Sequence, residues 1–217
     1  MASKGKILRI VAVLTLAAIA TTSLYQVVPA AVADFATLKA RYEIERLRDG
    51  QRPMPTLPAW AQLRDDLAQA ASWVPDNPRW YDDLGFLYVL RARNTPNVPE
   101  LAALRRNLYA EAADQYRQAA RLRPMFPFGW ANLALAKHYA DQDDEELWSA
   151  FDKAFAYGHH EVGVQRMLAE LAFARWSTLS AERAAAVTAM IAETRADLRQ
   201  PLLDLAKRYA VDLPSGH

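Results

Sequence analysis

The sequence predicts an all-α protein, a short helical solenoid with an N-terminal membrane-spanning helix and a C-terminal helical cap. Three observations lead to this prediction. The 217 residues are 52% hydrophobic and include only 7 glycines, which suits a helical chain better than a turn-rich β protein. An uncharged run of 19 residues occupies positions 10–28. Two segments, 75–85 and 124–134, share a proline-led aromatic pattern at the spacing of a helical repeat.

The uncharged run 10–28 follows Lys4, Lys6 and Arg9 and precedes Asp34, the first acidic residue. A transmembrane helix needs about 20 apolar residues, and the basic flank stays on the cytoplasmic side. We therefore expect a single pass through a bacterial inner membrane, with the C-terminal domain in the periplasm.

A cleaved signal peptide is the competing interpretation of the N-terminus. Ala31-Val32-Ala33 forms a small-x-small site after Pro29, so the mature chain would begin at Asp34 and be periplasmic. The run exceeds the usual signal-peptide core of about 7–15 residues, which favours the uncleaved anchor. A buried core helix is disfavoured, because soluble helices rarely carry such a run with both faces apolar.

The repeat pattern alternates interlocking aromatic and small residues over two helices. Small residues let the helices approach closely, and a proline ends the second one. The residues in these positions are Tyr81, Leu84, Gly85 and Tyr88, then Ala112, Tyr116, Ala119 and Pro124. This pattern resembles the tetratricopeptide repeat, in one good unit and two partial ones over residues 58–158.

The expected organisation has four parts. Residues 1–33 form the signal anchor or signal peptide, and 34–57 a periplasmic helix, ended by Gly50, with a proline-rich linker. The repeats occupy 58–158, with helices expected at 59–73, 78–92, 99–123, 127–140 and 144–157. Residues 159–217 form a helical cap over the last repeat, and its final helix is expected to begin at Pro201.

One insertion interrupts the repeat. Tyr88 and Ala112 lie 24 positions apart, about 15 more than the pattern allows. The extra residues are expected to lengthen the second helix, so that Leu101, Leu104 and Leu108 project beyond its neighbours. Either the chain's own helix 34–48 covers these leucines, which we favour, or they form a surface for a protein partner.

Charge and cysteine content exclude several classes of function. Beyond residue 33 the chain carries 23 basic and 25 acidic residues, so no basic excess points to nucleic acid. The absence of cysteine excludes disulfides, thiol catalysis and a cysteine-linked lipid anchor.

No pattern points to catalysis, a metal or a cofactor. Phosphate loops, dinucleotide fingerprints and nucleophile elbows are absent. His159 and His160 lack the spacing of a zinc site, and the acidic run 141–146 lacks the glycine of a calcium loop. Asp82 and Asp83 diverge on a helix, whereas glycosidases need two carboxylates facing across a cleft. We therefore expect a non-catalytic protein without cofactors.

The first helix of each tetratricopeptide unit lines a concave groove that binds protein partners. The residues that would face this groove are Arg79, Asp82, Asp83, Phe86, Phe128, Ala131, Asn132, Leu135 and His138. The resemblance places Asn132 where family members often hold a ligand backbone. The alternative is that Phe86, Phe128 and Leu135 are simply core residues.

Three further segments, 116–124, 128–137 and 164–171, resemble the small tetratricopeptide-type proteins of bacterial polysaccharide biosynthesis, the VpsP type. The resemblance extends over most of the chain, including the membrane segment and the tail of short helices. It implies a membrane-anchored adaptor or scaffold in exopolysaccharide synthesis and export, whose partners are proteins of that complex. The alternatives are a scaffold of a secretion or pilus apparatus and, from another class, a carbohydrate-active enzyme.

Overall fold

The computed structural model of the chain describes residues 2–213. All regular secondary structure in that range is helical. The all-α prediction is therefore confirmed. The chain divides into two compact units, Met1–Asp76 and Asn77–His217. The helix that the sequence assigned to the start of the repeats, near residue 58, belongs to the first unit.

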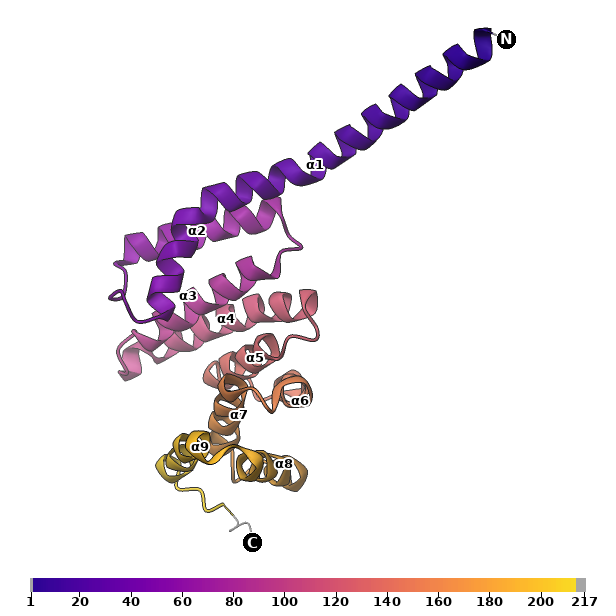
Figure 1. Cartoon of the computed structure of the whole chain (residues 1–217). Coiled ribbons are helices and arrows are strands. Elements are labelled where there is room, and N and C mark those ends of the chain that lie inside the picture. Colours follow the sequence, from indigo (N-terminus) through magenta and orange to yellow (C-terminus); the bar gives the residue numbers. More distant parts are fainter. Residues whose placement is uncertain (1, 214–217) are drawn as a thin grey trace. The chain divides into compact units, whose positions relative to one another are not determined.

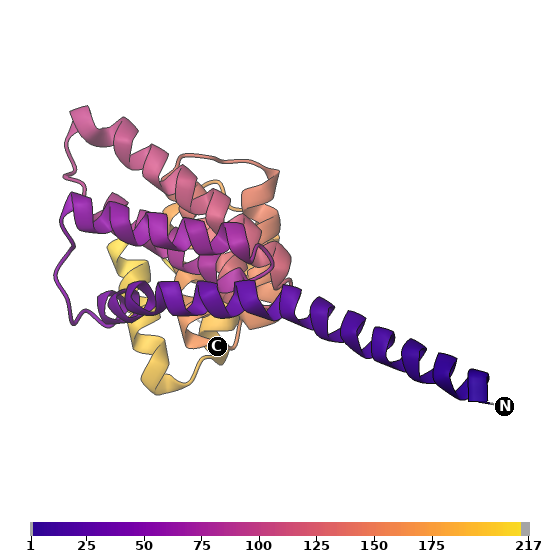
Figure 2. The same ribbon diagram turned by 90° about the horizontal axis from the view of Figure 1, so that it is seen from above.

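The first unit is a hairpin of two antiparallel helices, α1 (Ala2–Arg48) and α2 (Leu57–Trp73) (Figure 1). Helix α1 is continuous through Pro29, as the second view also shows (Figure 2). Its 47 residues span about 70 Å at 1.5 Å per residue. It ends where the sequence predicted, because Gly50 adopts a φ of 67° in the turn that follows.

The N-terminal part of α1 is apolar and exposed on all sides. Val11, Leu14, Leu16 and Ile19 are all more than half exposed. The segment is long and apolar enough, with a mean hydropathy of 1.8, to cross a membrane. Both the expected anchor and an N-terminal signal sequence share this property.

The C-terminal part of α1 is amphipathic instead. Its buried residues, Ala33, Thr37, Ala40 and Ile44, recur at helical spacing and so share one face. The buried hydroxyl of Thr37 donates a hydrogen bond to the Ala33 carbonyl at 2.6 Å. Burial of this hydroxyl therefore does not leave a donor without a hydrogen-bond partner.

The second unit contains one 3₁₀ turn and seven α-helices, among the residues described. They are α3 (Pro78–Arg93), η1 (Pro99–Leu101), α4 (Ala102–Leu122), α5 (Pro127–Tyr139), α6 (Glu145–Gly158), α7 (Val162–Ala174), α8 (Ala181–Glu193) and α9 (Ala196–Arg208). From α4 onward each α-helix packs against the one before it, and α5 also contacts α7, as α7 contacts α9. The unit is thus a run of successive helical hairpins (Figure 1).

Proline and short polar caps set several helix starts. Pro78 and Pro127 occupy the first turns of α3 and α5, where a missing N–H costs nothing. Asn77 caps α3 by accepting a hydrogen bond from the Arg79 amide at 3.1 Å. Ser180 caps α8 in the same manner.

The insertion lengthens the second helix of the hairpin, as expected. The loop 94–98 is followed by η1 and then by the 21 residues of α4. The prediction for the last helix was wrong in its start: α9 begins at Ala196 and carries Pro201 in its interior. Arg199 holds this earlier first turn against the end of α8 by donating to the carbonyls of Ala192 and Thr194.

A single hydrophobic core runs through the second unit from α4 to the segment after α9. It contains Tyr116, Leu133, Phe151, Leu168 and Leu205, among others. The C-terminal helices therefore share one core with the hairpins before them.

Candidate functional site

The nine residues of the predicted groove lie on α3 and α5, as expected, but differ in exposure. Asp83, Ala131 and Leu135 are buried, and the two apolar ones belong to or border the core. The remaining six are partly exposed: Arg79, Asp82, Phe86, Phe128, Asn132 and His138. Phe128 packs against the core, so it has a structural role whatever else it contacts.

The polar members of the predicted groove interact within the chain. Asp82 accepts a hydrogen bond from Arg123, whose guanidinium also lies 4.3 Å from the centre of the Phe126 ring. Asp83 lies 3.8 Å from Arg79 on the same helix. The Asp82–Arg123 pair joins α3 to the turn after α4, whereas the Arg79–Asp83 pair lies within α3. Each carboxylate thus lies beside a guanidinium, so α3 does not present two free acids.

His138 is tied to the end of α7. The Nε of Arg175 donates to the Nδ1 of His138 at 3.1 Å, and Arg175 also pairs with Asp143 at 2.5 Å. Burial lowers the pKa of His138, and the positive charge of Arg175 lowers it further. The histidine is therefore neutral at pH 7 and acts here as an acceptor.

The candidate partner surface lies at the start of α4. Leu104 is 48% exposed, and Leu101 and Leu108 are partly exposed. Their cover by residues 34–48 stays a prediction.

Two cavities of the second unit that are lined by charged and aromatic residues lie beside this helix extension. Two cavities of about 760 and 500 Å³ adjoin, and both are lined by Arg93, Tyr109 and Tyr139. We call them together the Arg–Tyr cleft. Its charged and aromatic lining residues are Arg93, Arg105, Arg106, Tyr109, Tyr139, Arg166, Glu170, Arg208 and Tyr209.

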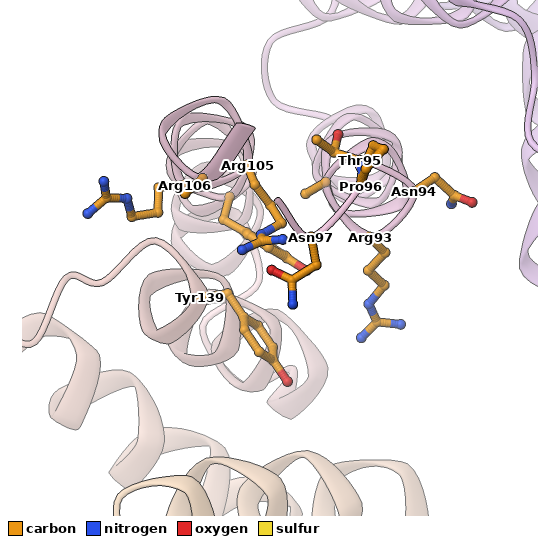
Figure 3. A pocket seen from close by; sticks show the side chains of 11 residues that line it. Arg93, Asn94, Thr95, Pro96, Asn97, Arg105, Arg106 and Tyr139 are labelled. Carbon is orange, nitrogen blue, oxygen red and sulfur yellow. The ribbon is translucent and has the colours of Figure 1, made fainter. Parts of the chain in front are cut away.

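Several side chains of the cleft come from helix ends, whereas Tyr109, Arg166 and Glu170 lie within α4 and α7. Arg93 ends α3, Arg105 belongs to the first turn of α4, and Tyr139 ends α5. The polar loop 94–97 forms one rim. Figure 3 shows Arg105 and Asn97 directed into the space between the helices, whereas Arg106 points outward.

Two tyrosines form the floor that both cavities share. The rings of Tyr109 and Tyr139 are stacked, with centroids 5.0 Å apart. The Tyr139 hydroxyl donates to the Glu170 carboxylate, and burial together with this bond raises the pKa of Tyr139. Burial also raises the pKa of Tyr109, although the nearby Arg93 and Arg105 act in the opposite direction. Both phenols stay protonated at physiological pH and can serve as hydrogen-bond donors or acceptors.

The cleft carries a strong excess of positive charge. Five arginines line it, with Glu170 as the one acidic lining residue. Arg106 lies 3.9 Å from Asp141. Among residues 2–213, no carboxylate lies within ion-pair distance of Arg93, Arg105, Arg166 or Arg208. An anionic ligand would meet guanidinium groups that are not already neutralised.

The sequence did not predict this cleft, because its residues come from five helices. Arg93, Arg105 and Arg106 belong to the inserted segment, where the leucine pattern indicates only which face of the helix is apolar. The only available signal was the cluster of arginines beside a loop rich in asparagine and proline.

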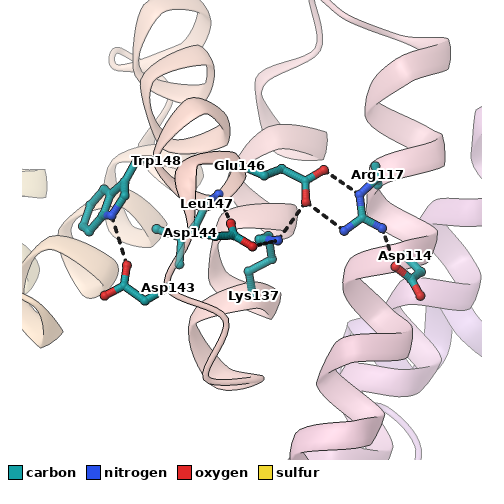
Figure 4. A network of polar contacts seen from close by, with 8 residues as sticks. All are labelled: Asp114, Arg117, Lys137, Asp143, Asp144, Glu146, Leu147 and Trp148. Carbon is teal, nitrogen blue, oxygen red and sulfur yellow. Dashed lines mark hydrogen bonds and ion pairs between the residues drawn. The ribbon is translucent and has the colours of Figure 1, made fainter.

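A second polar cluster has a structural role. Lys137 is 2% exposed and donates to Asp144 at 2.8 Å and to Glu146 at 2.7 Å. Arg117 completes the cluster by donating twice to Glu146, at 2.5 and 2.9 Å (Figure 4). These contacts join α4, α5 and α6 and satisfy a buried ammonium.

This cluster accounts for much of the acidic run 141–146. Asp144 caps α6 by accepting from the Leu147 amide at 3.0 Å, and Asp143 accepts from Trp148 at 3.1 Å. The run is therefore a charged turn that starts α6. Within the described part of the chain, no group of three or more histidines or acids is arranged to hold a metal ion.

Comparisons of the chain with protein families, with curated proteins and with solved structures give no match.

Proposed function

We propose that this protein is a non-catalytic, membrane-anchored adaptor in bacterial exopolysaccharide synthesis and export. In this proposal α1 spans the inner membrane, and the second unit is a short tetratricopeptide-like solenoid in the periplasm that binds other proteins of the complex. The partly exposed polar and aromatic residues of its predicted groove are Arg79, Asp82, Phe86, Phe128, Asn132 and His138.

One observation carries the proposal. The segments that resemble the polysaccharide-associated proteins, 116–124, 128–137 and 164–171, lie on α4, α5 and α7, which pack in sequence around one core. Gly85 meets Tyr116 where the repeat pattern requires a small residue against an aromatic one. The pattern in the sequence and the packing of the helices thus agree, and the long apolar stretch of α1 supplies a means of attachment.

The test is removal of the protein from the bacterium that makes it. We expect loss or shortening of the secreted polysaccharide, restored by the wild-type chain. We also expect in-cell crosslinking to join the protein to glycosyltransferase, polymerase or export subunits. Normal polysaccharide with lost pili or lost secretion would favour the alternative apparatus and contradict the proposal.

A further inference from the structure

The Arg–Tyr cleft has the composition of a site for an anionic ligand. Its arginines are presented by α3, α4, α7 and α9 around one open space, and the net charge of its lining is four positive, from five arginines and one glutamate. Arg106 lies near Asp141, but the like charges of the cleft still repel one another and raise the free energy of the folded chain, so their convergence is best explained by an anionic ligand that neutralises them.

The arginines select carboxylates or other planar, branched anions. A guanidinium presents its donors in a rigid fork that matches a carboxylate in two parallel hydrogen bonds. Arg105 is only partly exposed and points into the cleft, so its fork is directed at the space that a ligand would occupy (Figure 3). Arg93 and Arg166, which line the second cavity, are exposed and can follow a longer ligand.

The rest of the lining suits a hydroxyl-rich chain better than a peptide. Asn97 offers a donor and an acceptor beside the arginines. The hydroxyls of Thr95 and Tyr139 donate to the Arg91 carbonyl and to Glu170, so they can act toward a ligand as acceptors. The aliphatic lining is limited to Ala92, Pro96, Ala102 and Leu205. A protein partner normally inserts a few aliphatic or aromatic anchors into deep pockets. The apolar surface of the cleft comes mainly from tyrosine rings and small side chains, against which the faces of sugar rings can pack.

We propose that the Arg–Tyr cleft binds a polysaccharide chain that bears carboxylates, such as a polymer of uronic acids. This inference rests on the proposed function and extends it, because the adaptor then contacts the polymer as well as its protein partners. Two adjoining cavities that share Arg93 and both stacked tyrosines allow successive sugar residues to be held along one path.

The binding test uses the full chain in uncharged detergent micelles and short oligogalacturonates as the probe, measured by calorimetry. We expect saturable binding that weakens with added salt, since exposed charges are screened within about 8 Å at physiological ionic strength. The methyl-esterified oligomers, which lack the charge, should bind at least tenfold more weakly. Equal binding of the neutral and charged oligomers would overturn the proposal.

The variant is Arg93→Gln with Arg105→Gln, and the matched control is Arg121→Gln. Arg121 is an exposed arginine on the same helix as Arg105, 16 residues away, or about 24 Å. We expect the double variant to lose tenfold or more in affinity, because each replacement removes the charge-assisted hydrogen bonds of one guanidinium. The control should bind as the wild type does. Helical circular dichroism and melting of each variant establish that it is folded.

A parallel titration with an oligoglutamate peptide separates polymer from protein. If the peptide binds more tightly than the oligogalacturonates, the cleft is a docking site for an acidic protein segment and the proposal is wrong. Affinity for oligogalacturonates that is unchanged in the folded double variant also contradicts it.

The same variants distinguish this inference from the proposed function in cells. If removal of the whole protein stops polysaccharide secretion while the double variant secretes normally, the adaptor role stands and the cleft inference falls. If removal of the protein leaves secretion unchanged, the proposed function falls, whatever the cleft binds in solution.

Discussion

Gly85 and Tyr116 pack directly against each other where α3 crosses α4. A Cβ atom at position 85 would lie 2.6 Å from the Cε1 of Tyr116 and 2.8 Å from two further ring carbons. No side-chain carbon tolerates such distances, so the ring or the helix would have to move. Gly85 is 31 residues from Tyr116 in sequence, and the contact fixes how closely the two long helices approach.

Gly85→Leu should overpack this contact and lower the free energy of unfolding by about 1–3 kcal/mol or more. The reason is that Tyr116 is itself buried, at 4% exposure, and has little room to rotate away. Thermal and urea unfolding of the purified protein measure the change. Ala185→Leu, at an exposed position of α8, is the control and should change stability little. An unchanged melting temperature in Gly85→Leu would show that the helical register inferred from the repeat pattern is wrong.

The Glu146 carboxylate should make stability dependent on acid pH. The hydrogen bond from Arg117, with a further one from Lys137, lowers the pKa of Glu146 from 4.5 to about 2. A carboxyl group with a lowered folded-state pKa stabilises the fold above its unfolded pKa, and this contribution is lost as the pH falls through the folded value. The loss should therefore occur between about pH 4.5 and pH 2.

Glu146→Gln isolates this contribution. The wild type should melt at a higher temperature than the variant at pH 6 to 7, and the difference should narrow steadily below pH 4.5. Because the glutamate side chain is 38% exposed, solvent screening keeps the effect modest. A difference in melting temperature that stays constant down to pH 2.5 would contradict the assignment.

Asp144 has two roles that substitution can separate. It caps α6 through the Leu147 amide and pairs with Lys137. Asp144→Asn keeps a good cap and removes the charge, whereas Asp144→Ala removes both. We expect Asp144→Ala to cost about 1 kcal/mol more than Asp144→Asn in urea unfolding, the usual contribution of a cap. An equal loss of unfolding free energy in the two variants would mean that the cap does not contribute to stability and that the whole effect comes from the ion pair.

Much of the fold follows from local sequence signals. Proline at the starts of α3 and α5 and Gly50 after α1 act through their own backbone preferences, so they mark helix ends without knowledge of the packing. The start of α9 differs from the sequence prediction, because proline favours the first turn of a helix but Pro201 lies inside a helix that begins at Ala196. There the side-chain bonds of Arg199 to the end of α8 support an earlier start, and these depend on tertiary contact.

The candidate site was less accessible from the sequence. The expected groove residues were identified from the repeat pattern, but their pairing was not: nothing in the spacing of Asp82 and Arg123, 41 residues apart, indicates that they meet. The Arg–Tyr cleft was missed for the same reason, since Arg93, Tyr139 and Arg208 come together only when α3, α5 and α9 pack. The spacing of apolar residues along a helix indicates which of its faces is buried. It does not indicate which helix ends lie close together in the folded chain.

The N-terminal helix gives a prediction about topology. Lys4, Lys6 and Arg9 precede the apolar run 10–28, and basic residues beside a first transmembrane helix stay on the cytoplasmic side. A reporter that is active only in the periplasm, fused after His217, should therefore be active, and a cytoplasmic reporter at the same place should not.

The protein should also fractionate with membranes and keep its full mass, because the exposed apolar residues of α1, such as Leu14 and Ile19, would then lie in the bilayer. Activity of the cytoplasmic reporter would contradict the periplasmic location altogether. A mature chain beginning at Asp34, detected by mass spectrometry, would contradict only the anchor and leave the domain in the periplasm.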